Sequence, residues 1–350
     1  MAVLLPLMAD GWVDNYEDIM LKRKLGNSGI GASVIGLGTW VTGGWMWGGA
    51  DDRESIKAIH AGLEAGIDLI DTAPVYGFGH SEEVVGKAIK GRRDKVVLAT
   101  KCGLVWDKAE GVLHFTSNEK TVTKTDFTKS VYKYLNPGSI RTEVEQSLKR
   151  LQTDYIDLYQ THWQDETTPI CDTMSMLLKL KDEGKIRAIG VSNASVEQMK
   201  EYGAIDTAQE KYSMLARKLD ENGITKYCPD NNVAILAYSP LANGLLTGKI
   251  NEQTQFGEGD LRKGNPLFTK ENLTKVSVML NEFIPIAEEN GMTVTQLVMG
   301  WTLQRKGITH LLVGARNEQQ AIENSGGGKS LLPEQERTKI DEIISSYFAF

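Results

Sequence analysis

Short apolar segments alternate with amphipathic stretches along this chain, from about residue 30 to about residue 325. The apolar segments are mostly β-branched and are bounded by glycine or turn residues, which is typical of buried strands. Eight are found: Val34–Leu37, Leu69–Asp71, Lys95–Lys101, Tyr155–Thr161, Ile186–Val191, Thr207–Gln209, Val233–Tyr238 and Ile308–Val313. The amphipathic stretches that predict helices include Glu54–Glu64, Glu82–Ile89, Ile140–Leu151 and Met174–Glu183. This alternation predicts a parallel sheet.

Eight strand–helix repeats predict that the sheet closes into a (β/α)8 TIM barrel, an α/β fold. The alternative is an open doubly wound sheet, which would place a G-x-G-x-x-G turn between an early strand and a helix. The glycines of this chain do not stand in that context. Gly36 and Gly38 lead into Thr39 and Trp40, and the run Gly326–Gly328 lies near the C-terminal end. The sequence therefore favours the barrel.

The first residues do not fit the barrel pattern. Residues 1–19 hold a short apolar stretch with no basic residue before it and acidic residues after it, which makes a poor secretory signal. We expect residues 1–19 to be an extension outside the fold and residues 20–350 to form one barrel domain. Leu21–Leu25 and Ala32–Ile35, joined by Gly26–Gly29, predict a β-hairpin that plugs the barrel bottom.

Charge and hydropathy exclude two classes of partner. The chain has 39 basic and 46 acidic residues, a net charge of −7. It has no long run of like charge, and an acidic chain is repelled by phosphate backbones. No apolar run approaches the roughly 20 residues that cross a bilayer. We therefore expect neither a nucleic-acid nor a membrane partner, and we leave the oligomeric state, including a homo-oligomer, open.

The cysteines indicate a reducing compartment. Cys102, Cys171 and Cys228 are odd in number, lie far apart and form no C-x-x-C pair. This pattern argues against a disulfide framework and against a zinc site. We expect a cytoplasmic protein without a bound metal.

Two insertions interrupt the strand–helix rhythm. One, Leu104–Pro137, follows the third strand, and the other, Asn251–Lys270, follows the seventh. Loops that follow the strands of such a barrel lie on its C-terminal face, where active sites are found. Both long loops are therefore expected at the functional end.

Four polar residues are expected to meet on that face. Asp71, Lys101 and His162 end consecutive strands, and Tyr76 lies in the loop just after Asp71. A lysine at the end of an apolar strand is costly unless it is paired, and Asp71 is the neighbouring partner. A cation near a phenol favours the phenolate, so we expect Lys101 to lower the pKa of Tyr76 toward neutrality. Tyr76 would then deliver a proton to a carbonyl oxygen that His162 orients.

Each of these residues also has a purely structural interpretation. A tyrosine in a loop is ordinary, and Asp71 with Lys101 can be a structural ion pair. Their convergence from three consecutive strands favours function.

Several segments resemble the aldo-keto reductase superfamily, in the family's order, from about residue 20 to residue 345. They are Asp71–Gly77, Ala99–Lys101, Asp157–Trp163, Gly190–Asn193 and Tyr238–Leu241. The resemblance implies a catalytic tetrad of Tyr76 as general acid with Lys101, Asp71 and His162. It also implies an NADP-dependent oxidoreductase that passes hydride directly from the nicotinamide to an aldehyde or ketone.

The same resemblance implies the cofactor contacts. Ser192, Asn193 and Gln209 match the residues that hold the nicotinamide carboxamide, Tyr238 matches the aromatic that stacks on the ring, and Ser239–Gly244 with Lys249 matches the pyrophosphate loop. Taken alone, Tyr238 can also be a core aromatic at a strand end. The full set of expected contacts is Gly38, Thr39, Trp40, Asp71, Ser192, Asn193, Gln209, Tyr238, Ser239, Pro240, Leu241, Asn243, Gly244, Lys249, Arg262, Gly314, Arg316, Gln320, Glu323 and Asn324.

The segment after the last strand resembles the adenosine end of that site. Gly314–Gln320 opens a short helix that is expected to end at Glu323–Asn324. A helix N-terminus beside Arg316 suits a ribose 2′-phosphate, and Arg262 adds a second cation. These residues favour NADPH over NADH, although the chain lacks the Lys-Ser pair that some relatives use there.

The sequence says less about which residues contact the substrate than about those that contact the cofactor. Met46, Trp47 and Trp163 are expected to wall the pocket beside Tyr76 and His162, although such aromatics can also cover the barrel mouth without touching substrate. Lys120, in the first insertion, is a candidate contact for a polyol or an anion, although most such lysines are solvated.

Within the superfamily, the runs Tyr76–Glu83 and Ser147–Tyr155 resemble bacterial members that act on sugars and inositols. This likeness suggests a role in carbohydrate metabolism, with an oxo-sugar reductase of sulfosugar breakdown as one hypothesis.

Three other functions stay open at this point. The chain could be a barrel lyase with a Schiff base on Lys101, a nucleotide-sensing subunit with little turnover, or an NAD(P)-linked sugar or inositol dehydrogenase. The cofactor-matching segments argue against the first, and no partner-binding extension favours the second.

Overall fold

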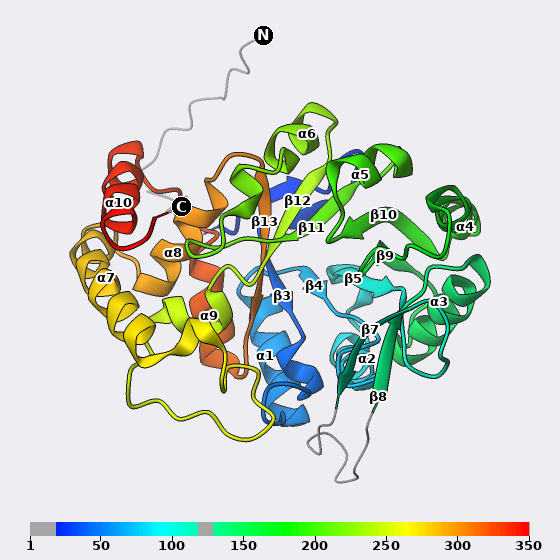
Figure 1. Cartoon of the computed structure of the whole chain (residues 1–350), viewed down its shortest axis with the longest axis horizontal. Helices are drawn as coiled ribbons and strands as arrows, with labels where there is room; N and C mark the ends of the chain where they lie inside the picture. The colour runs from blue at the N-terminus through cyan, green and yellow to red at the C-terminus, as the bar shows by residue number, and fades with distance from the viewer. Residues whose placement is uncertain (1–18, 118–128, 350) are drawn as a thin grey trace, which may run out of the picture.

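Eight parallel strands close into a barrel at the centre of the molecule (Figure 1). A computed structural model describes residues 19–117 and 129–349. Around the barrel the strands follow the order β10-β11-β12-β13-β3-β4-β5-β9. Their bounds are β3 Ile35–Gly38, β4 Leu69–Asp71, β5 Val97–Cys102, β9 Ile156–Thr161, β10 Ile186–Ser192, β11 Thr207–Lys211, β12 Ala234–Tyr238 and β13 Ile308–Gly314. The predicted TIM barrel is confirmed, and all eight predicted strands are present.

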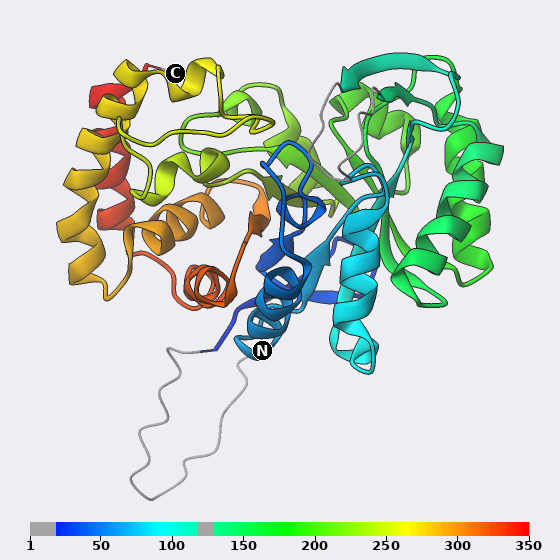
Figure 2. The ribbon, with the colours of Figure 1, turned by 90° about the horizontal axis from the view of Figure 1, so that it is seen from below.

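Helices surround the strands, with α7 and α10 on one side and α3 and α4 on the other (Figure 2). The described helices are α1 Asp52–Glu64, α2 His80–Ile89, α3 Pro137–Leu151, α4 Ile170–Asp182, α5 Val196–Tyr202, α6 Ile224–Asp230, α7 Lys270–Glu289, α8 Val294–Leu303, α9 Glu318–Gly326 and α10 Glu334–Tyr347. Short 3₁₀ turns are η2 Val41–Gly43, η3 Arg93–Lys95, η4 Lys218–Asp220, η5 Ala242–Thr247 and η6 Pro266–Phe268. The helix after β13 runs to Gly326, slightly beyond its predicted end at Asn324.

Local sequence signals set several helix ends. Asn136 caps α3 by accepting a hydrogen bond from the Gly138 N–H, and Pro137 occupies the first turn, where no N–H is needed. Thr293 and Gln296 form a reciprocal capping box at the start of α8. Gly184 follows α4 with a φ of 73°, a left-handed conformation that glycine adopts without strain.

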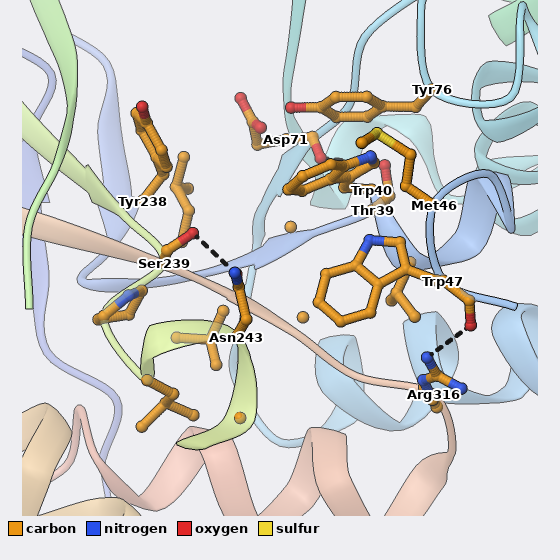
Figure 3. A pocket seen from close by; sticks show the side chains of 18 of the residues that line it. Thr39, Trp40, Met46, Trp47, Asp71, Tyr76, Tyr238, Ser239, Asn243 and Arg316 are labelled. Atoms are coloured by element: carbon orange, nitrogen blue, oxygen red, sulfur yellow. Dashed lines mark hydrogen bonds between the residues drawn. The ribbon is translucent and has the colours of Figure 1, made fainter. Parts of the chain in front are cut away.

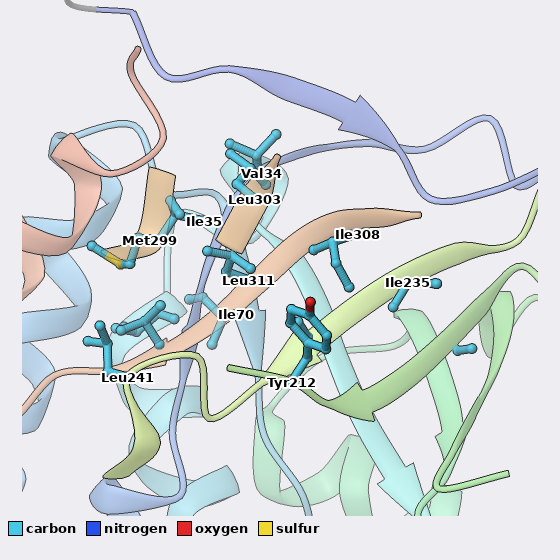
Figure 4. Packing of buried hydrophobic residues seen from close by; sticks show 14 of the residues in the cluster. Val34, Ile35, Ile70, Tyr212, Ile235, Leu241, Met299, Leu303, Ile308 and Leu311 are labelled. Carbon is cyan, nitrogen blue, oxygen red and sulfur yellow. The ribbon is translucent and has the colours of Figure 1, made fainter. Parts of the chain in front are cut away.

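The main hydrophobic core lies between the barrel and its helices. Figure 4 shows Ile35, Ile70 and Leu311 of the barrel beside Met299 and Leu303 of α8. A second, smaller cluster fills the barrel interior and consists of Leu25, Ala32, Leu69, Ala99, Leu158, Ala188, Ala234, Leu236 and Leu312. Six of the eight strands, all except β3 and β11, supply residues to both cores, as expected for a sheet covered on both faces.

A β-hairpin closes the end of the barrel from which the strands start. Strands β1 (Lys22–Lys24) and β2 (Gly31–Ser33) pair antiparallel, as the sequence predicts. Leu25, between them, is fully buried in the interior cluster. Gly26 has a φ of 54°, and a Cβ there would lie 2.1 Å from the Asp206 carbonyl oxygen. Close approach therefore requires glycine at this turn.

The N-terminal extension falls almost entirely outside the described residues. Ile19 is exposed, whereas Met20 packs into the main core. The boundary between an extension and a barrel domain stays a prediction.

The two insertions build different structures. The first contains an antiparallel sheet in the order β6-β8-β7, with bounds β6 Leu104–Val105, β7 Val112–Ser117 and β8 Lys129–Lys133. The second, residues 251–270, is largely irregular and includes η6. Within the described part of the chain, no helix is long and apolar enough to span a bilayer, and no cluster of ligand-type side chains suits a metal ion.

Candidate active site

A cavity of about 640 Å³ opens where the barrel strands end. Five of its lining residues are the last residues of their strands: Gly38, Asp71, Ser192, Tyr238 and Gly314. Carboxyl-terminal strand ends are the expected location of a site in this fold. Figure 3 shows Tyr76 near one end of the cavity and Arg316 near the other, with Trp40 and Trp47 between them.

Three of the four predicted catalytic residues meet at the ammonium group of Lys101. Its Nζ lies 2.7 Å from Asp71 Oδ2, 2.9 Å from the Thr72 carbonyl oxygen and 3.3 Å from Tyr76 Oη. Lys101 is completely buried and lies behind the cavity wall, whereas Asp71 and Tyr76 line the cavity. The positive charge of Lys101 is therefore balanced by Asp71 on one side of the ammonium group. On its other side the ammonium group faces the phenol of Tyr76.

The pKa of Tyr76 departs from the expectation. Burial raises this pKa well above its ordinary value, and the negative charge of Asp71 raises it further. The predicted lowering by Lys101 is wrong, because Asp71 balances much of the charge of Lys101 and the phenol is removed from water. Burial also lowers the pKa of Lys101, against the opposing effect of Asp71. Tyr76 is thus held as a protonated phenol, the form that can donate a proton.

His162 faces Tyr76 across the cavity. The two rings stand nearly perpendicular, with centroids 5.7 Å apart. Burial lowers the pKa of His162 well below its ordinary value, and electrostatic interactions with Lys101 and His114 lower it further. A neutral imidazole keeps one N–H donor, so His162 can donate a hydrogen bond without carrying charge.

Two amide side chains hold the second oxygen of Asp71. Gln209 Nε2 lies 2.8 Å and Gln160 Nε2 3.3 Å from Asp71 Oδ1. Gln209 was predicted as a cofactor contact, whereas sequence reasoning missed Gln160. The feature that could have identified Gln160 is its register in the sheet. Gln160 pairs with Lys101 on the neighbouring strand, so the two side chains point to the same face.

The residues predicted for the nicotinamide end lie together. Tyr238 Oη donates to Asn193 Oδ1 at 2.9 Å, and Asn193 Nδ2 donates to the His162 carbonyl oxygen at 3.0 Å. Ser192 Oγ donates to the Gln209 carbonyl oxygen at 2.8 Å. Asn193 has a φ of 54°, a left-handed conformation that asparagine tolerates better than most residues. This array offers fixed amide and hydroxyl groups beside an aromatic side chain.

The predicted pyrophosphate loop has an unusual backbone. Ser239, Ala242, Asn243 and Gly244 all have positive φ, between 47° and 91°. Three of them are not glycine, so the surrounding structure must maintain the strain. Successive turns of this kind form concave groups of N–H donors that bind anions. The loop therefore fits a diphosphate.

Two arginines lie at the far end of the cavity, as predicted for a 2′-phosphate. Arg316 Nη2 donates to the Trp47 carbonyl oxygen at 3.0 Å, and its guanidinium carbon lies 5.6 Å from the Trp47 ring centroid. Arg262 pairs with Asp260 through two hydrogen bonds of 2.8 and 2.6 Å. Trp47, predicted as a substrate contact, is thus placed beside the arginines of the cofactor end.

All the residues predicted to contact the cofactor line this one cavity. The indole nitrogens of Trp40 and Trp47 are buried there without a hydrogen-bond partner among the described residues. Unpaired buried donors in the middle of an elongated cavity fit a polar ligand that spans it. The residues present therefore fit a dinucleotide.

The opposite end of the cavity has an aromatic wall. Trp163 lies there as predicted, and Lys120 lies outside the described residues. Sequence reasoning missed the neighbouring residues Trp45, Val75, Leu104, His114 and Phe115. His114 and Phe115 belong to β7, and only the folding of the first insertion brings them to the site.

Comparisons with known proteins agree with this arrangement. The model of the aldo/keto reductase family matches residues 34–345. An aldo-keto reductase YhdN of Bacillus subtilis is 44% identical over 303 residues, 85% of each chain. An NADH-specific methylglyoxal reductase of Escherichia coli is 39% identical over 336 residues, 93% of this chain and 99% of that protein.

Solved structures show the same likeness. The glycerol dehydrogenase AKR11B4 from Gluconobacter oxydans superposes with a TM-score of 0.81 at 38% identity and covers 95% of this chain and 96% of its own. An aldo/keto reductase from Klebsiella pneumoniae in complex with NADP and acetate superposes with a TM-score of 0.64 at 28% identity. The match covers 91% of this chain and 93% of the Klebsiella chain.

Proposed function

We propose that this chain, which belongs to the aldo/keto reductase family, reduces a sugar- or polyol-like aldehyde or ketone to the alcohol with Tyr76 as the general acid. Family membership makes the protein an oxidoreductase that acts on carbonyl and alcohol groups, and related structures have been solved with NADP or NADPH bound. The observation that carries the finer proposal is the contact of Tyr76 Oη with Lys101 Nζ, beside the cavity and opposite His162.

The proton is assigned to the phenol of Tyr76. Its raised pKa keeps the proton in place until a carbonyl oxygen becomes basic. Lys101, 3.3 Å from the phenol oxygen, stabilises the phenolate that remains after transfer. Asp71 holds Lys101 in place, and Gln209 and Gln160 hold Asp71.

The substrate carbonyl oxygen is assigned to the space between Tyr76 and His162. A neutral His162 donates a hydrogen bond to this oxygen and stabilises the negative charge that develops on it. Donors fixed in a water-poor site need no reorganisation during the reaction.

The cofactor is assigned along the rest of the cavity. Asn193, Ser192 and Gln209 would hold the carboxamide, Tyr238 the ring, the loop of Ser239–Gly244 the diphosphate, and Arg262 with Arg316 the 2′-phosphate. When bound, NADPH supplies the hydride that reaches the carbonyl carbon. Relatives include both NADP-linked and NADH-specific enzymes, so the two arginines are the basis for preferring NADPH.

The substrate class rests on the pocket and on the relatives. Two similar proteins are described as a glycerol dehydrogenase and a methylglyoxal reductase, both enzymes of small oxygenated compounds. Aromatic faces with a few polar groups suit a short carbon chain that carries oxygens. Because one relative is described as a dehydrogenase, oxidation of a polyol by the same site is the second candidate. A Schiff base on Lys101 is not supported, because Lys101 is fully buried and does not line the cavity.

The Tyr76→Phe variant tests the proton assignment. It removes only the hydroxyl, so we expect kcat to fall by about 10²- to 10⁴-fold while NADPH binding, followed by tryptophan fluorescence, is unchanged. Activity within a few-fold of the wild type would overturn the assignment.

The Arg316→Ala variant tests the cofactor assignment. It should weaken NADPH binding by about 10- to 100-fold, as expected for loss of a charge-assisted contact, and should leave NADH binding nearly unchanged. Lys226→Ala, at an exposed ion pair, is the matched control. Equal losses for both nucleotides would remove the 2′-phosphate assignment.

A further inference from the structure

An imidazole from outside the barrel lies in the substrate end of the cavity. His114 belongs to β7, in the inserted sheet, and lines the cavity with Phe115, Trp45 and Trp163. Its ring centroid lies 4.8 Å from that of Trp163 and 5.2 Å from that of Phe115. These rings fix the plane of the imidazole. Within residues 19–117 and 129–349, neither ring nitrogen has a hydrogen-bond partner.

The charge state of His114 decides what it can bind. Burial lowers its pKa, and the positive charge of Lys133 lowers it further. At neutral pH the ring is therefore uncharged and offers one N–H donor and one nitrogen acceptor. A hydroxyl group, which also donates and accepts, is the natural complement. A carboxylate or phosphate can use only the N–H donor of an uncharged imidazole, whereas a hydroxyl can use both ring nitrogens.

The position of His114 separates it from the reacting atoms. It comes from the inserted sheet, whereas Asp71, Lys101 and His162 come from the barrel strands or their ends. It nevertheless lies within electrostatic reach of His162, because protonation of His114 would further lower the pKa of His162. Two uncharged imidazoles thus face one pocket, one beside Tyr76 and one farther along the aromatic wall.

We propose that His114 is a specificity-determining residue that binds a substrate hydroxyl beyond the reacting carbonyl, so that short hydroxyaldehydes and hydroxyketones are preferred over their deoxy analogues. This inference rests on the proposed carbonyl reduction at Tyr76. Trp45, Phe115 and Trp163 cover the C–H faces of the carbon chain, and His114 supplies the polar contact of this wall. A site that hydrogen-bonds a hydroxyl rejects the analogue that lacks it, because the polar group of the site is left unpaired.

The test compares glyceraldehyde with propionaldehyde, which lacks both hydroxyl groups. In the wild type, kcat/KM with NADPH should favour glyceraldehyde. In His114→Phe this preference should fall by about 10- to 100-fold, chiefly through a higher KM for glyceraldehyde, while kcat for propionaldehyde changes little. His114→Gln, which keeps a donor and an acceptor, should restore much of the preference and covers the case in which the phenylalanine variant does not fold.

Leu113→Ala is the matched control, because Leu113 precedes His114 on β7 and is 53% exposed. An unchanged preference in both His114 variants, or equal losses on both aldehydes, would overturn the inference. Failure of the proposed function gives a different result: the wild type would reduce neither aldehyde, or Tyr76→Phe would reduce both as well as the wild type does.

Discussion

The two faces of strand β5 carry two buried ionic clusters of similar composition. Thr100 points outward and donates to Glu82 Oε1 at 2.7 Å, and Arg150 Nε donates to Glu82 Oε2 at 2.6 Å. Lys101, the next residue, points inward, and its Nζ donates to Asp71 Oδ2 at 2.7 Å. Glu82 and Lys101 are both completely buried. Burial and ion pairing therefore do not distinguish the two clusters.

The two clusters differ in whether they reach the cavity. Both oxygens of Glu82 are satisfied by Thr100 and Arg150, and neither Glu82 nor Arg150 lines the cavity. The inner cluster continues through Asp71 and Tyr76 to the cavity wall. The outer cluster joins α2 and α3 to the barrel, whereas the inner one reaches the cavity through Tyr76, the proposed proton donor. Access to a cavity, rather than the presence of a buried charge, identifies the site.

Strand β11 repeats the arrangement with consecutive residues. Gln209 points inward and donates to Asp71, and Glu210 points outward and accepts from the Ala194 N–H at 3.0 Å. Burial raises the pKa of Glu210 to about 7, against the lowering effect of the Ala194 and Asn193 N–H groups. Glu210 thus stabilises the turn that carries Asn193, although Glu210 does not itself line the cavity.

The largest expected effect comes from breaking the inner cluster. Lys101→Met should lower kcat by about 10²- to 10⁴-fold, because the phenolate of Tyr76 loses its stabilising cation. It should also reduce the free energy of unfolding by about 3–5 kcal/mol, since Asp71 is left as a buried unpaired charge. Steady-state kinetics on protein shown to be folded by circular dichroism measures the first effect. A variant with nearly wild-type kcat would show that both clusters are structural.

Breaking the outer cluster should affect stability and spare turnover. Glu82→Gln leaves Arg150 without its anion, and we expect the free energy of unfolding to fall by about 2–3 kcal/mol in urea titration. The kcat/KM of the folded enzyme should stay within about twofold of the wild type, because Glu82 does not line the cavity and its charge is the smallest of the effects on the pKa of Lys101. A large loss of kcat with unchanged stability would contradict the division between the two faces.

The smallest effect is a pH dependence at Glu210. The pKa of Glu210 in the folded protein, about 7, lies above its ordinary value of 4.5. Its contribution to stability is therefore present below about pH 4.5 and is lost as the pH rises through about 7. Relative to the wild type, Glu210→Gln should gain on the order of 2 kcal/mol between pH 5 and pH 8. Thermal melts at both pH values measure this, and a pH-independent difference would show that Glu210 does not titrate in this range.

Sequence reasoning reached the barrel and much of the site because both depend on local pattern. Strand–helix alternation predicted all eight strands, and position at a strand end predicted that Asp71, Lys101 and His162 lie together at one face of the barrel. It missed Gln160 because a glutamine inside an apolar strand carries no distinguishing signal until its neighbour in the sheet is known. It missed His114 because an insertion of irregular composition does not reveal which of its residues fold back toward the barrel.

What the sequence alone determined was the barrel, its bottom hairpin and the face on which polar strand ends gather, since periodicity and chain order suffice for these. The tertiary structure decided the ionisation of Tyr76, the position of Trp47 beside the arginines and the presence of His114 in the pocket. The physical reason is that a pKa depends on burial and on the balance of nearby charges, here Asp71 against Lys101. A pocket wall likewise depends on which distant segments pack together, and neither property is local in the chain.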